Sequence, residues 1–113
     1  MDFNIDLLKE KIVDIVNDIA NNNYSKIEME QKNGRVNIND LKRSINEYGR
    51  TIIPLPNEAF KFMEIYHVES KNMLHIVIDL WTKEEGRSDL TLSLNAYIKN
   101  NLLFIEIDDC HVL

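Results

Sequence analysis

The spacing of apolar residues in this chain changes once, near residue 61, and this change restricts the fold more than any other sequence feature. Before it, apolar residues recur every three or four positions, as in amphipathic helices; after it they alternate with polar residues, as in strands. Helices followed by a run of strands are typical of an α+β domain. With 113 residues, 44% of them hydrophobic, the chain is expected to form a single domain, residues 1–113, around one core.

Two helices are expected in the first half, over residues 5–20 and 38–48. Asn4 and Asn37 precede them and are expected to cap them, because a side-chain oxygen there accepts a hydrogen bond from a first-turn N–H group. The asparagines after the first helix, and Gly49 after the second, tolerate the left-handed backbone that ends many helices. The side of the first helix opposite its apolar stripe carries Asp6, Glu10, Asp14 and Asp18.

Two connecting segments are less regular. Residues 26–31 can form a helical turn before a bend at Asn33 and Gly34. Residues 52–57 contain two prolines, which cannot lie inside a sheet ladder, so this segment is expected to be an extended connector.

Four strands are expected in the second half, over residues 63–69, 73–82, 88–99 and 102–112. Short loops join them, which indicates an antiparallel meander. The predicted fold is therefore α+β, with two N-terminal helices followed by a four-stranded antiparallel meander sheet, in two layers.

The pairing of these strands follows from two predicted hairpins. A loop at residues 83–87 that sets Leu80 opposite Leu90 gives the pairs Ile78–Leu92, Ile76–Leu94 and Leu74–Ala96. A two-residue turn at Asn100 and Asn101 gives the pairs Ile98–Leu103, Ala96–Ile105 and Leu94–Ile107. Both registers make the same face apolar, and a slip of one residue would turn all of these side chains outward.

The other face of the predicted sheet is mixed acidic and aromatic. Its residues are His75, Val77, Asp79, Trp81, Asp89, Thr91, Ser93, Asn95, Tyr97, Phe104, Glu106 and Asp108. Three arrangements stay open: a solvated surface, a contact surface for a basic protein, or a face that the first helix covers with the aromatic residues as core. Aromatic side chains surrounded by carboxylates suit a partner rich in lysine and arginine.

The net charge of −6, from 13 Lys+Arg and 19 Asp+Glu, opposes binding to nucleic acid or an anionic membrane and favours a basic protein partner. Most of the acidic excess lies in residues 62–113, which hold 4 basic and 9 acidic residues. No apolar run approaches the roughly 20 residues that cross a bilayer, and the acidic N-terminus does not fit a secretory signal. A cytoplasmic protein is expected.

The sequence contains no recognisable catalytic or metal-binding motif. Cys110 is the only cysteine, which excludes an internal disulfide and a multi-cysteine zinc site. Strand alternation predicts Asp108 and Cys110 on one side and Asp109 and His111 on the other, which separates both a Cys–His pair and a four-ligand metal site. The three glycines are isolated and form no phosphate loop. No cofactor and no metal are therefore predicted.

An acidic group surrounds the predicted hairpin loop and consists of Asp79, Glu84, Glu85 and Asp89. Carboxylates of this kind can hold magnesium or act as a general acid and base. Arg87 beside Gly86 is more typical of loop architecture, in which a guanidinium pairs with carboxylates. A metal-dependent hydrolase is therefore the less favoured alternative, and the protein is not expected to be an enzyme.

Three segments carry a resemblance to a known family: WTKEEGRSDLTLSL at residues 81–94, EIDDCHVL at 106–113 and INEYG at 45–49. They resemble a small bacterial domain family of unknown function whose members have about this length. Similar small acidic proteins serve as immunity proteins beside toxins of contact-dependent growth inhibition and related polymorphic systems. The resemblance implies an immunity protein but transfers no catalytic residues.

The leading hypothesis is an immunity protein that binds and neutralises a cognate basic toxin domain of the nuclease class. A nuclease presents lysine and arginine to phosphates, and a carboxylate-rich surface imitates that polyanion. The residues expected to bind the toxin, with Trp81 as the anchor, are Asp79, Trp81, Glu84, Glu85, Asp89, Glu106 and Asp108. A non-catalytic regulatory or scaffold module is the alternative, and the sequence leaves the oligomeric state open.

Overall fold

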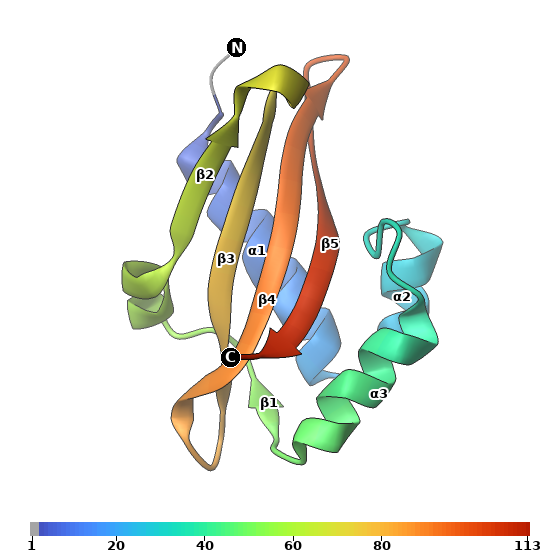
Figure 1. The fold of residues 1–113 in the computed structure, drawn as a ribbon, viewed down its shortest axis with the longest axis vertical. Helices are drawn as coiled ribbons and strands as arrows, with labels where there is room; N and C mark the ends of the chain where they lie inside the picture. The colour runs from blue at the N-terminus through green and yellow to red at the C-terminus, as the bar shows by residue number, and fades with distance from the viewer. Residues whose placement is uncertain (1–2) are drawn as a thin grey trace.

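The computed structural model describes residues 3–113 and shows helices first and an antiparallel sheet second (Figure 1). The helical elements are α1 (Ile5–Ala20), α2 (Tyr24–Met29), α3 (Ile38–Tyr48) and the short 3-10 turns η1 (Asn57–Phe62) and η2 (Glu69–Lys71). The strands are β1 (Ile52–Ile53), β2 (Glu64–Val68), β3 (Met73–Thr82), β4 (Gly86–Lys99) and β5 (Leu102–Val112). The predicted α+β class is confirmed.

Both predicted helices form with their predicted ends. Asn4 Oδ1 accepts a hydrogen bond from the Leu7 N–H at 3.1 Å, and Asn37 caps α3 in the same way. Gly49 ends α3 with a φ of 73°, in the left-handed region that favours glycine. The helical turn expected at residues 26–31 lies slightly earlier and forms α2.

The sheet is antiparallel in the order β1-β3-β4-β5, and β2 also pairs with β3. β2 to β5 are the four predicted strands of the meander, each within two residues of its expected bounds. The addition is β1, where an extended connector was predicted: Ile52 and Ile53 pair with the far end of β3, immediately before Pro54. Proline lacks the N–H that a longer ladder would need.

Both predicted registers are confirmed over most of their length. Ile78–Leu92 and Leu94–Ile107 pair as expected, and Asn100 and Asn101 form the turn with φ of 53° and 64°. The Leu80–Leu90 pair is wrong, because the register shifts beyond Asp79–Thr91. The hairpin closes more tightly, with Thr82 opposite Gly86.

The core lies between α1 and one face of the sheet. Leu8, Ile12 and Ile15 of α1 are fully buried, as are Leu92 and Leu94 of β4. Each such side chain contributes about 1.5–3 kcal/mol through removal of apolar surface from water. Figure 1 shows α1 behind the sheet, whereas α2 and α3 lie beside β5. The predicted two layers thus describe α1 and the sheet but not the other two helices.

Asp18 is buried, although it was predicted to lie on the solvent-exposed side of α1. It is only 4% exposed, because α2 packs against the end of α1, and its Oδ1 lies 3.2 Å from Lys26 Nζ. Asp6, Glu10 and Asp14 do not share this burial and lie at or near the surface. The acidic stripe is therefore solvated except at its C-terminal end.

Candidate functional site

Among the described residues 3–113, no helix crosses the face of the sheet that is turned away from α1, as Figure 1 shows. We call it the open face. Cross-strand pairing assigns to it Glu64 and Tyr66 of β2, His75, Val77 and Asp79 of β3, Thr91, Ser93, Asn95 and Tyr97 of β4, and Phe104, Glu106, Asp108, Asp109 and His111 of β5. The alternative in which the first helix covers this face, with the aromatic residues as core, is therefore wrong.

A bulge in β5 changes which residues reach the open face. The register shifts between Ser93 and Leu94, so that Asp109 rather than Asp108 is the Cα partner of Ser93. Cys110 consequently turns into the core, while Asp109 and His111 lie on the open face. The predicted sharing of a side by Asp108 and Cys110 is wrong, because a bulge inserts one residue and interrupts alternation.

A hydrogen-bonded row crosses the middle of the open face. His75 Nδ1 lies 2.9 Å from Asn95 Oδ1, and Asn95 Nδ2 donates to Asp108 Oδ1 at 3.2 Å. Tyr66 stands beside His75 with their ring centroids 6.4 Å apart. Residues from β2 to β5 are thus in register across the sheet, and one carboxylate oxygen of Asp108 is held in place.

Aromatic side chains border this row. Tyr97 and Phe104 stack with centroids 5.7 Å apart and an angle of 17° between the rings. Phe104, Tyr66 and Phe62 of η1 are 41%, 50% and 44% exposed. Burial and the nearby Glu106 raise the pKa of Tyr97, so its hydroxyl is a neutral hydrogen-bond donor at neutral pH. Exposed aromatic groups are frequent anchors in protein interfaces.

Asp79 lies on the open face but is not free to bind a partner. Its Oδ2 is 2.7 Å from Arg87 Nε, and its Oδ1 accepts from Thr91 Oγ1 at 3.3 Å. The Arg87 guanidinium also lies over the Phe62 ring, 3.8 Å from the centroid. Asp79 therefore holds Arg87 in place, and Arg87 and Phe62 present the outer surface of this cluster.

Glu84 and Glu85 lie at the β3–β4 hairpin, away from the middle of the open face. Both oxygens of Glu84 accept hydrogen bonds from Thr51, one from the N–H at 2.8 Å and one from Oγ1 at 2.7 Å. These hydrogen bonds lower the pKa of Glu84. Glu85 accepts from the Tyr48 hydroxyl at 3.0 Å. The two carboxylates thus tie the hairpin to the end of α3.

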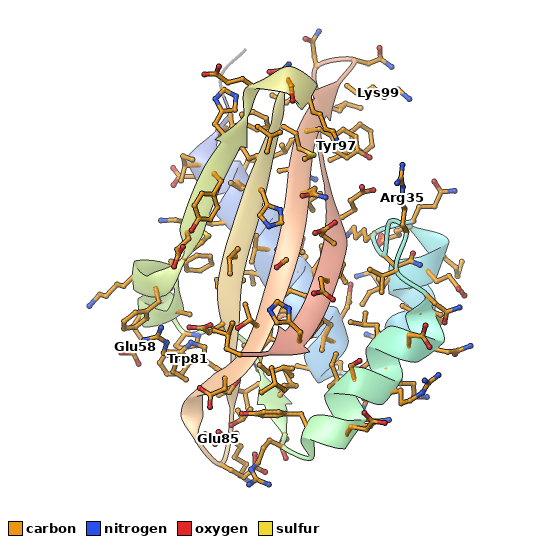
Figure 2. All side chains as sticks on the ribbon, viewed as in Figure 1. Arg35, Glu58, Trp81, Glu85, Tyr97 and Lys99 are labelled. Carbon is orange, nitrogen blue, oxygen red and sulfur yellow. The ribbon has the colours of Figure 1, made fainter. Side chains whose placement is uncertain are left out.

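The seven sequence-predicted residues therefore fall into two groups. Glu106 and Asp108 lie on the open face near Tyr97, whereas Trp81, Glu84, Glu85 and Asp89 lie toward the hairpin end of the sheet, where Figure 2 shows Trp81 and Glu85. Trp81 is half-buried and packs beside Gly86. Asp89 is exposed, and Asp79 lies between the two groups with its oxygens occupied.

Sequence reasoning missed Phe62, Tyr66, Arg87 and Asp109 as residues of this surface. Asp109 could have been found, because the apolar positions Ile107 and Cys110 are three residues apart in an otherwise alternating strand, and such a break is typical of a bulge. Phe62 and Tyr66 lie outside the central hairpins, and their exposure depends on how β2 packs at the sheet edge.

Two basic residues border the acidic part of the open face. Arg35 and Lys71 line a cavity of about 210 Å³ together with Asn95, Glu106 and Asp108. Figure 2 shows Arg35 beside β5, on the loop that follows α2. These cations reduce the local negative potential.

The chemistry of the remaining reactive groups is restricted. Cys110 is buried, and burial together with Asp109 raises its pKa to about 12, so its thiolate is scarce at neutral pH. Within residues 3–113, no three or more His, Cys, Asp and Glu side chains come together in a way that could hold a metal ion. None of the helices in the described part of the chain combines the length and apolar character needed to cross a membrane.

Comparison with known proteins gives a family but no activity. No curated protein matches the chain, and no solved structure does. The model of a family described as a domain of unknown function (DUF7668) matches residues 16–113, and the chain therefore belongs to that family.

Proposed function

We propose that this chain is a cytoplasmic immunity protein that binds a cognate basic toxin domain, of the nuclease class, and neutralises it. The single observation that supports this most is the open face, where exposed aromatic rings lie beside carboxylates on a sheet surface that no helix of the described chain covers. The small size of the chain and its net charge of −6 point the same way, because similar small acidic bacterial proteins serve as immunity proteins.

The carboxylates supply the electrostatic part of the argument. Glu106, Asp108 and Asp109 follow one another along β5, and Glu64 stands across the sheet on β2. Residues 62–113 hold 4 basic and 9 acidic residues, so most of the net charge of −6 belongs to the half that forms the sheet. A nuclease surface that binds phosphates attracts such a polyanion and associates with it rapidly.

The aromatic groups supply the part of the binding energy that salt does not screen. Tyr66, Phe104 and Phe62 are exposed on three different elements, β2, β5 and η1, and a partner that covers them removes apolar surface from water. Trp81, Glu85 and Asp89 at the hairpin end form a second contact region in this proposal, whereas Thr51 occupies both oxygens of Glu84. Asp79 acts there indirectly, by fixing Arg87.

The proposal is tested with the toxin domain encoded beside this gene. Cells that produce that domain survive when the chain is co-produced, and the two purified proteins form a complex. Association slows as ionic strength rises, since opposite charges steer the encounter. Absence of both protection and binding would exclude the proposal.

Matched charge reversals locate the contact. Glu106→Lys and Asp108→Lys slow association by about tenfold or more at low salt, while Glu10→Lys, on the exposed side of α1, has a much smaller effect. Phe104→Ala accelerates dissociation instead, because it removes an apolar anchor. Equal effects at Glu10 and Glu106 would show that net charge alone matters and that the open face is not the contact.

A further inference from the structure

β5 is an edge strand, and part of its outer edge is unpaired. Lys99 and Leu102 flank the two-residue turn as a hydrogen-bonded pair, so Leu103, Ile105 and Ile107 direct their N–H and C=O groups away from β4. The Ile107 N–H donates to the Lys32 carbonyl at 2.7 Å, as expected for a backbone group that points away from β4. Within residues 3–113, no backbone group pairs with the outward N–H and C=O of Leu103 and Ile105.

A groove of about 560 Å³ runs beside these unpaired groups. One wall is Leu102–Glu106 of β5, and the other is formed by residues 30–32 at the end of α2. Leu102 is 60% exposed and Phe104 is 41% exposed, so apolar surface lies along the strand. An exposed edge of this kind is a template for pairing with another extended chain.

The charges around the groove differ in sign from those of the molecule as a whole. Lys11, Lys32 and Lys99 line it, against Glu30 and Glu106, so the groove is locally positive in a chain of net charge −6. Lys32 Nζ lies 3.3 Å from Glu30, which leaves Lys11 of α1 and Lys99 of β4 as the cations at its two sides.

We propose that the outer edge of β5 at residues 103–105 binds an extended acidic segment of a partner protein as an additional strand. The segment donates to and accepts from the backbone of Leu103 and Ile105. Side chains of the bound segment alternate between the two faces of the sheet, as in any strand. Those on one face lie near Lys99 and Phe104, and those on the other face lie near Lys11 and Leu103. This edge shares Phe104 and Glu106 with the open face, but the proposal rests on the unpaired backbone groups and does not depend on the toxin hypothesis.

A second copy of this chain does not fit the same position. If Leu103 pairs with Ile105 of a second β5, the turn at Asn100 and Asn101 of that copy arrives opposite Ile107. Lys32 already occupies that place through its hydrogen bond to the Ile107 N–H. A single extended segment needs only one strand width and ends before Lys32.

The test uses the full-length protein and two short acetylated probe peptides, one alternating glutamate with valine and the other alternating lysine with valine. Amide hydrogen exchange is followed by NMR. In the free protein the Leu103 and Ile105 amides exchange fast, while the amides of Phe104 and Glu106 are protected, because their N–H groups point toward β4. The glutamate peptide slows exchange at Leu103 and Ile105 by about tenfold or more, and the lysine peptide has no such effect.

Three variants make the result specific. Lys99→Glu weakens binding of the glutamate peptide by about fivefold, whereas Lys83→Glu, in the distant hairpin loop, leaves it unchanged. Leu103→Pro removes one outward N–H without touching the ladder to β4, and it abolishes protection at Ile105. Protection of both amides in the free protein, equal binding of the two peptides, or an unaltered affinity in Lys99→Glu would each overturn the proposal.

Discussion

Arg87 Nε lies 2.7 Å from Asp79 Oδ2, and this ion pair joins β4 to β3 across the point where their regular pairing is interrupted. The Asp79 side chain is 11% exposed and that of Arg87 is 49% exposed, so the carboxylate is the buried partner. Thr91 donates to the other Asp79 oxygen. The contact therefore stabilises an irregular part of the sheet through one exposed cation.

Removal of that cation leaves a mostly buried carboxylate without its charged partner. Arg87→Ala is expected to lower the free energy of unfolding by about 1–3 kcal/mol in urea titrations. Arg43→Ala, which removes an exposed ion pair with Asp40, is the matched control and should cost about 0–0.5 kcal/mol. Adding Asp79→Asn to Arg87→Ala should recover part of the loss. Equal effects of the two arginine substitutions would contradict a structural role for the Arg87 pair.

Gly34 is expected to be the glycine least tolerant of a side chain. Its φ is +54°, and a Cβ there would lie 3.0 Å from the Ile107 carbonyl oxygen, a backbone atom. Gly34→Ala should lower the free energy of unfolding by about 1–2 kcal/mol and weaken the protection of the Ile107 amide. Gly49→Ala has the same backbone strain, but its Cβ would meet nothing closer than 3.9 Å, so a loss of about 1 kcal/mol or less is expected. A larger loss of stability in Gly49→Ala than in Gly34→Ala would show that the loop around Gly34 shifts to accommodate a side chain.

The pH dependence of stability should reveal the Glu84–Thr51 contact. The hydrogen bonds from Thr51 lower the pKa of Glu84 in the folded state below its ordinary value of 4.5. Their contribution is therefore fully present above pH 4.5 and is lost as the pH falls through the folded-state pKa. Glu84→Gln should lower Tm at pH 7, and the difference from the unmodified protein should shrink in acid. Glu47→Gln, on the exposed side of α3, controls for the loss of one negative charge.

The Cys110 thiol should be unreactive toward thiol reagents in the folded protein. With a pKa of about 12, about one thiol in 10⁴ is ionised at pH 8, and the side chain is also buried. A disulfide reagent should label it within minutes in urea and by orders of magnitude more slowly without urea. Rapid labelling of the native protein would mean that the bulge in β5 leaves Cys110 open to solvent.

The sequence alone determined the parts of this protein that rest on local chemistry. Apolar spacing and the caps Asn4 and Asn37 determined α1 and α3, because each signal acts within a few residues. The turn at Asn100–Asn101 determined the β4–β5 register, since two residues tolerant of positive φ leave few ways to join two strands.

The tertiary structure decided which side chains are available. In the sequence, Asp79 and Glu84 are both acidic residues near a predicted hairpin loop, and nothing there shows that their oxygens are occupied. In the structure, Arg87 binds Asp79 and Thr51 binds Glu84. Strand alternation predicts the face of the sheet on which a side chain lies. Its exposure depends on which other residues pack against it, and those residues are distant in the sequence.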